Sequence, residues 1–206
     1  QDGLDTSFFQ NPSPLPGSSN YPLANIGMSD TKQDSSWTFL TKNAAGLAVV
    51  GMSQYQNGQL INIPIYSVII TFPSTMGTNF GGVWNGQLVA FPIGQDLDGP
   101  GPQGVIDSLK ITRSADVTSN IDGWGNVTTP VGTYPSLRGK NTQYKTDSTF
   151  IYMAGPWQFS GPPSLDTTIT YDWWINNNFP VATIETDGSG QIKSASYVLS
   201  STVGIK

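Results

Sequence analysis

The chain lacks the residue types on which most enzymes depend. It has no histidine and no cysteine, and Glu185 is the single glutamate among 206 residues. Imidazoles, thiolates and paired carboxylates carry most acid–base, nucleophilic and metal chemistry near neutral pH. Their absence or scarcity argues against catalysis, and the absence of cysteine excludes disulfide bridges. The composition therefore predicts a protein that is not an enzyme.

Charge is also scarce. Charged residues make up 11% of the chain, with a net charge of −5. Nucleic acid and anionic membranes bind basic surfaces, so neither nucleic-acid binding nor membrane insertion is expected. No run approaches the ~20 consecutive apolar residues of a membrane span. The surface must consist largely of uncharged polar side chains, which weakens repulsion between copies and favours self-association.

Glycine (23), proline (15) and aromatic residues are abundant and divide the chain into short β-like runs. No segment keeps a helical period for more than about a turn. This pattern predicts an all-β fold, an antiparallel β-sandwich or jelly-roll-like domain that spans residues 37–206. Hairpin turns are expected at Asn57-Gly58, Asp122-Gly123 and 187–190, and a turn-rich crossing at 80–86. Strands are expected at 37–40, 47–52, 59–72, 87–93, 105–121, 144–153, 167–175, 180–186 and 191–199.

Residues 1–36 differ from the rest, because they keep neither a strand nor a helix period. They predict an extended, proline-rich N-terminal arm. One alternative is a loop packed across its own domain, and the other is an arm that reaches a neighbouring subunit. The residues expected to make the arm contacts are Asn11, Pro12, Pro14, Leu15, Pro16, Tyr21 and Pro22.

Two stretches carry a family resemblance. Residues 122–134 read DGWGNVTTPVGTY, with Leu137 and Arg138 following, and residues 171–182 read YDWWINNNFPVA. They resemble the DGWGTLTTPxGTYxxLR and YxWWxxxxGFPV patterns of uncharacterised secreted β-sandwich proteins of Bacteroidota, which are often linked to type IX secretion. Gly139 departs from the pattern, which has an apolar residue after the arginine. The resemblance implies a secreted or cell-surface location and supplies no activity.

The same resemblance implies possible O-glycosylation, because proteins of that phylum are modified at Asp-Ser or Asp-Thr followed by an apolar residue or Thr. The matching positions are Ser108, Ser148 and Thr167. Gln1 is expected to be a mature terminus exposed by removal of a signal peptide, which agrees with export.

The aromatic residues carry the sharpest functional hypothesis. Trp124, Tyr134 and Trp173 are expected to face the core. Neighbours in a strand face opposite sides, so Trp173 and Trp174 cannot both be buried there. Exposed indoles can stack against sugar rings or anchor a subunit interface, whereas buried indoles simply fill a β-core. The candidates for exposed aromatic residues are Trp157, Trp174 and Trp84.

Metal and acid chemistry have weaker signals. Asp96 and Asp98 have the spacing of the first two ligands of a calcium loop, but no later carboxylate follows at the EF-hand spacing. No cofactor is therefore expected beyond a single irregular Ca²⁺. Asp172 and Glu185 lie on successive predicted strands and could pair as the two carboxylates of a glycoside hydrolase.

Together these observations predict a non-enzymatic secreted or cell-surface protein. We expect a structural or adhesive subunit that assembles with copies of itself by arm or edge-strand exchange, with the arm and exposed aromatics buried by the neighbour. The alternatives are a carbohydrate-binding module with a Trp/Tyr platform that binds surface glycans, and a hydrolase. An arm folded over its own domain and a groove lined by two aromatics would favour sugar binding. Two carboxylates facing each other in a deep cleft would favour the enzyme.

Overall fold

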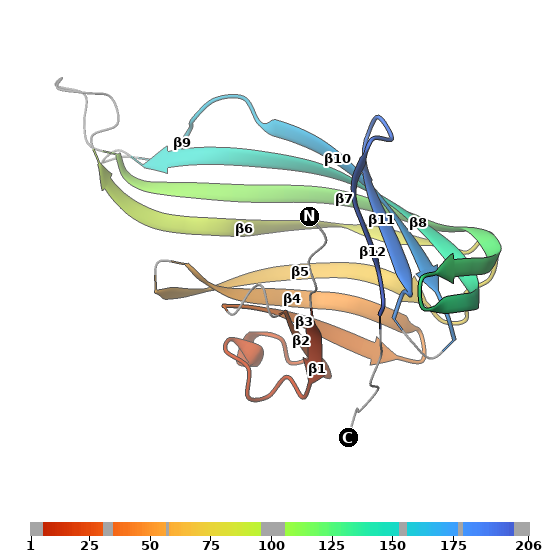
Figure 1. Ribbon diagram of the computed structural model, residues 1–206. Helices are drawn as coiled ribbons and strands as arrows, with labels where there is room; N and C mark the ends of the chain where they lie inside the picture. The colour runs from red at the N-terminus through yellow and green to blue at the C-terminus, as the bar shows by residue number, and fades with distance from the viewer. Residues whose placement is uncertain are drawn as a thin grey trace.

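The protein is an antiparallel β-sandwich, as the sequence predicts (Figure 1). The computed structural model describes residues 6–30, 35–56, 58–95, 106–152, 156–176 and 179–199. A five-stranded sheet has the order β1-β2-β3-β4-β5, and a seven-stranded sheet has the order β12-β11-β10-β8-β7-β6, with β9 pairing β8. The strands are β1 (Ser7–Gln10), β2 (Ile26–Asp30), β3 (Ser36–Asn43), β4 (Gly46–Gln56), β5 (Gln59–Thr71), β6 (Asn79–Gln95), β7 (Ile106–Thr129), β8 (Gly132–Tyr152), β9 (Gln158–Phe159), β10 (Ser164–Trp174), β11 (Ala182–Asp187) and β12 (Ile192–Tyr197).

Alternation along β3 gives the five-stranded sheet two buried faces. Leu40 is 1% exposed and packs between the sheets with Leu47, Ile70 and Trp174. Its neighbour Phe39 is fully buried on the opposite side of the sheet. Successive side chains of a strand point to opposite faces, so a second layer must cover the outer face of this sheet as well.

That layer is the segment between β1 and β2, which Figure 1 shows beneath the five-stranded sheet. Leu15 and Tyr21 are buried in it, and the Tyr21 ring stacks on Phe39 with 4.7 Å between ring centroids. The sheet leaves space for both side chains at glycines. A Cβ on Gly51 would lie 1.9 Å from the Tyr21 ring, and one on Gly27 would lie 2.3 Å from Leu15.

The prediction that residues 1–36 contain no strand is wrong at β1 and β2, which pair with each other and through β2 with β3. Between them, Leu15 N donates to Pro12 O at 2.9 Å, and Asn11 Oδ1 accepts from Ser13 N at 2.9 Å. These local turns conceal the period that a longer strand would display. Of the other residues assigned to the arm, Pro12 and Pro16 are half-buried and Pro14 and Pro22 are exposed.

Two turns of the seven-stranded sheet are not where the sequence predicts them. The segment 80–86 is part of β6, because its glycines allow close pairing: a Cβ on Gly81 would lie 2.1 Å from Val117 O. Asp122-Gly123 is a bulge inside β7, and the hairpin turns instead between Thr129 and Gly132. The predicted turns at Gly58, φ 77°, and at 187–190 are present, whereas Asn57 lies outside the described residues.

Between the sheets, the inner face of the seven-stranded sheet is partly apolar and partly ionic. Trp84, Ala115 and Val117 form a buried cluster. Farther along the same face, Arg113 donates two hydrogen bonds to Asp147, at 2.7 and 2.6 Å. Odd-numbered residues of β7 between 109 and 121 therefore face inward and even-numbered ones outward. Among the described residues, no helix has the length and apolar character to cross a bilayer.

Candidate functional site

Two tryptophans predicted to be exposed are buried. Trp174 is 7% exposed and packs against the five-stranded sheet, and Trp84 is 8% exposed beside Ala115. The prediction that they form a surface is therefore wrong. The alternation argument itself holds, since Trp173 lies on the opposite face from Trp174. The two side chains are exchanged relative to the prediction: Trp174, like Trp84, lies on the face that the five-stranded sheet covers, and Trp173 lies on the other face.

Trp124 is the converse case. We expected it in the core, yet it is 79% exposed, the highest value among the large apolar side chains described. The β7–β8 hairpin that carries it projects past the strands of the five-stranded sheet, so no opposing layer covers the indole (Figure 1). Tyr134, on the same hairpin, is half-buried beside Gly132 rather than in the core.

Trp124 and Trp173 together border an open hollow of about 290 Å³, which we name the tryptophan hollow. The bulge between Ile121 and Gly123 shifts the register of β7 at this point. A bulge re-aims the side chains around it, and the glycines on either side of Trp124 add no side chains that would fill the space. The hollow is lined by Gly123, Trp124, Gly125, Asn126, Ser136, Arg138 and Trp173.

The cation of the hollow is held firmly. Arg138 donates from Nε and Nη2 to the two carboxylate oxygens of Asp122, at 2.8 and 3.1 Å. Its guanidinium carbon also lies 5.6 Å from the Tyr171 ring centre. The hydrogen bond to Asp122 raises the pKa of Arg138 above its ordinary value. The register pairs Trp173 with Arg138 but Trp124 with Leu137, so the Trp124 indole lies on the opposite face from Trp173 and Arg138. The hollow therefore combines one indole, that of Trp173, with a fixed cation and a serine hydroxyl.

A second aromatic group lies at the other end of the same face, and we name it the Lys110 cluster. The Lys110 ammonium lies 4.7 Å from the ring centre of Phe150 and 4.5 Å from that of Trp157. Phe150 stacks with Phe159 at 4.4 Å, and Tyr152 lies 5.5 Å from Trp157. Trp157 is 38% exposed, as predicted, whereas the sequence analysis did not identify its partners.

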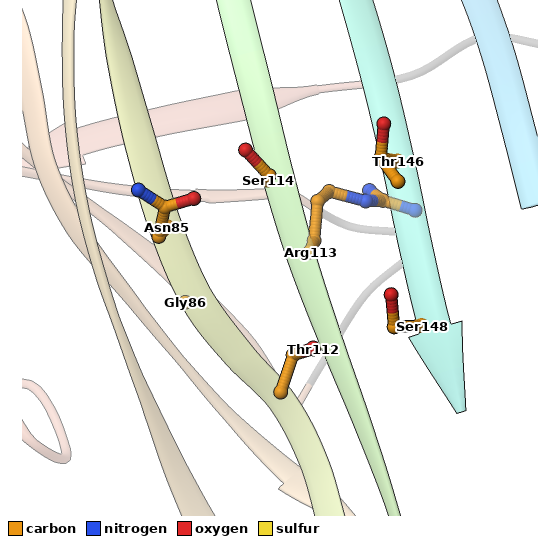
Figure 2. A pocket seen from close by; sticks show the side chains of 7 residues that line it. All are labelled: Asn85, Gly86, Thr112, Arg113, Ser114, Thr146 and Ser148. Atoms are coloured by element: carbon orange, nitrogen blue, oxygen red, sulfur yellow. The ribbon is translucent and has the colours of Figure 1, made fainter. Parts of the chain in front are cut away.

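A polar hollow of about 320 Å³ lies beside this cluster (Figure 2). It spans β6, β7 and β8, and short hydroxyl and amide side chains form most of its wall. Ser148, one of the candidates for O-glycosylation, lines it, and Ser108 and Thr167 are half-buried on the same outer face. The lining residues are Asn85, Gly86, Thr112, Arg113, Ser114, Thr146 and Ser148.

The two carboxylates considered for a hydrolase are diagonal neighbours. Asp172 pairs with Thr183 and Glu185 pairs with Thr170 on adjacent strands. Thr183 Oγ1 donates to Asp172 Oδ1 at 2.7 Å, and burial raises the pKa of Asp172. Neither carboxylate lines the tryptophan hollow or the polar hollow. Neither of these two hollows therefore brings the carboxylates together in the cleft that would favour an enzyme.

The calcium candidates Asp96 and Asp98 lie outside the described residues. Within the part of the chain that the structure describes, no three His, Cys, Asp or Glu side chains gather as a metal site.

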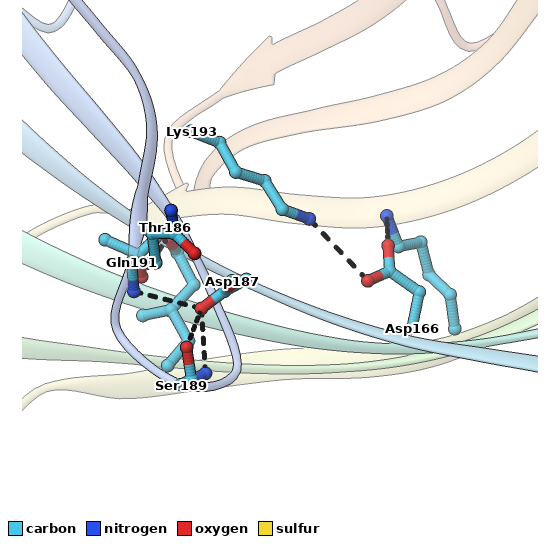
Figure 3. Close-up of polar contacts among 8 residues, drawn as sticks. Asp166, Thr186, Asp187, Ser189, Gln191 and Lys193 are labelled. Atoms are coloured by element: carbon cyan, nitrogen blue, oxygen red, sulfur yellow. Dashed lines mark hydrogen bonds and ion pairs between the residues drawn. The ribbon is translucent and has the colours of Figure 1, made fainter.

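The edge of the seven-stranded sheet is a further exposed feature. All six residues of β12 are exposed, including Ile192 at 64% and Tyr197 at 47%. The turn before it is fixed by Asp187, whose carboxylate accepts hydrogen bonds from Ser189 N, Ser189 Oγ and Gln191 N (Figure 3). These hydrogen bonds lower the pKa of Asp187.

Comparison with known proteins assigns no relative: no family model matches the chain, and neither a curated protein nor a solved structure matches it significantly.

Proposed function

We propose that this protein is a non-enzymatic carbohydrate-binding β-sandwich of a secreted or cell-surface kind, and that the tryptophan hollow is its sugar site. The observation that carries the proposal is the hollow itself, where Trp173 and the fixed Arg138 lie side by side on the outer face of the seven-stranded sheet. Ligand sites are concave and combine aromatic side chains with a few placed polar groups.

The chemistry of the lining fits a sugar ring. The C–H face of a pyranose is apolar and packs on an indole, while its hydroxyl groups need hydrogen-bond partners at the ring edge. Ser136 and Arg138 supply donors and an acceptor beside Trp173. Because Asp122 fixes the Arg138 side chain, little conformational entropy is lost when a sugar binds.

The fold also supports sugar binding over arm exchange. Leu15 and Tyr21 are buried against the protein's own five-stranded sheet, so an exchange would have to expose both. A segment folded over its own domain is one of the two features expected of a sugar-binding module, the other being a groove lined by two aromatic residues.

The test is a binding screen against immobilised neutral polysaccharides with wild-type protein, Trp173→Ala and Tyr66→Ala. Tyr66 is a matched control, since it is 59% exposed on β5 of the other sheet. Loss of a central aromatic contact weakens binding by about tenfold or more. We expect that loss for Trp173→Ala and wild-type binding for Tyr66→Ala. Equal binding by all three proteins, or no binding by the wild type, would contradict the proposal.

A second candidate function is self-association through β12, favoured by its exposed edge, on which Lys193 is the one charged residue. An open edge strand is a template for pairing with another chain, and lysines on an edge oppose such pairing. We expect light scattering to detect dimers or larger particles of the wild type and monomers of Ser194→Lys/Ser196→Lys. A monomeric wild type would exclude this candidate without affecting sugar binding.

A further inference from the structure

The outer face of β8 carries more than one aromatic site. Even-numbered residues of β8 face outward, because Arg138 lines the tryptophan hollow and Phe150 belongs to the Lys110 cluster, and β8 pairs with β10 without a register shift. Tyr144, 54% exposed, lies on this face six residues from each of them. At about 3.3 Å per residue, the two ends are about 40 Å apart along the strand.

The surface between these aromatic sites is polar and uncharged for most of its length. Beyond Tyr144, the polar hollow follows along β8, lined by Thr146 and Ser148 and by Ser114 and Asn85 from the neighbouring strands (Figure 2). The outer face of β8 therefore presents, in order, an indole site, a tyrosine, a hydroxyl-lined hollow and a second aromatic cluster.

The charges on this face select the class of ligand. The Lys110 ammonium is engaged by two rings, and Arg138 is paired with Asp122. Of the other described outward-facing residues of β7 and β8, the charged ones are Lys140 and Asp116, one of each sign. The named charges sum to three positive and two negative, so the face has little attraction for a polyanion, and its hydroxyl and amide groups match a neutral polyol.

We infer that the ligand is a long, neutral polysaccharide chain that lies along β8 and contacts the tryptophan hollow, Tyr144 and the Lys110 cluster together. This inference rests on the proposed sugar-binding function and names its substrate class. Contacts at several positions on one chain act as linked sites, so affinity increases with chain length until all of them are occupied. A disaccharide or trisaccharide reaches only one aromatic site.

The experiment measures affinity by calorimetry for one neutral polysaccharide that binds in the screen, and for its disaccharide, trisaccharide and long oligomers. The proteins are the wild type, Trp173→Ala, Tyr144→Ala, Trp157→Ala and Trp157→Phe, with Tyr66→Ala as the control. We expect the long oligomers to bind at least about tenfold more tightly than the trisaccharide. We also expect Trp157→Ala and Tyr144→Ala to lose that gain, and Trp157→Phe to restore most of it.

Polygalacturonate of similar length serves as the anionic probe, and equal binding to it would overturn the neutral-chain inference. If affinity for the wild type does not increase with length, or Trp157→Ala binds long oligomers as the wild type does, the extended site is overturned. The proposed function still stands in that case, provided that Trp173→Ala weakens the binding of short sugars. Near-ultraviolet circular dichroism checks that each variant is folded.

Discussion

The two sheets differ in how their outer faces are used. Residues 11–25 cover the outer face of the five-stranded sheet, and Tyr21 and Phe39 are buried there. On the outer face of the seven-stranded sheet, Asp116, Thr118 and Tyr144 stay exposed. Aromatic side chains occur on both faces. They stabilise the fold where the chain covers them, and they are available to a ligand where it does not.

The difference between the two outer faces is tested most directly by removing one aromatic side chain from each and comparing the loss of stability. Phe39→Ala removes a fully buried ring and leaves a cavity, so we expect the free energy of unfolding to fall by about 3–5 kcal/mol. Tyr144→Ala on the open face should change it by no more than about 0.5 kcal/mol. Urea denaturation measures both variants. Similar losses would mean that the open face is packed against something in solution.

A glycine substitution tests whether the loop between β1 and β2 is tightly fitted to the sheet. In Gly51→Ala the new methyl group collides with the Tyr21 ring, and overpacking of this kind costs about 1–3 kcal/mol. Gly82→Ala is the control, since a Cβ there meets nothing within 4 Å. We expect Gly51→Ala alone to speed proteolysis within residues 11–25. Unchanged proteolysis would show that the loop tolerates displacement.

The smallest effect concerns a charge on the covered inner face. Burial raises the pKa of Asp172 above its unfolded value, so the folded state loses stability as pH rises through the folded pKa. Asp172→Asn cannot ionise and keeps an oxygen that accepts from Thr183. We therefore expect this variant to be more stable than the wild type at neutral pH, with a difference that shrinks on acidification. A difference independent of pH would disprove the role of ionisation.

The sequence was sufficient for the architecture because strand period and turn residues are local signals. Gly58 and Asp187-Gly188 are turn residues that end the strands before them, and both hairpins are found as predicted. The glycines inside β6 and the bulge at Asp122-Gly123 were predicted to be turns, because in sequence a glycine that permits close strand pairing resembles one that permits a turn.

The site was harder to predict for a physical reason. Alternation places Trp173 and Trp174 on opposite faces, but which face is covered depends on where the other sheet ends. The exposure of Trp124 depends in the same way on the length of the β7–β8 hairpin relative to its partner layer. Lys110 could be assigned to an aromatic cluster only once the pairing of β7, β8 and β9 was known.

The order of the strands within each sheet has a consequence for how the chain folds. The five-stranded sheet uses β1 to β5 in sequence, and the seven-stranded sheet uses only later strands. Most pairings therefore close short loops, which lowers the entropic barrier relative to a sandwich whose strands alternate between sheets. The N-terminal sheet can form during synthesis before the second sheet is complete, and the two then join through the side chains around Leu40 and Trp174.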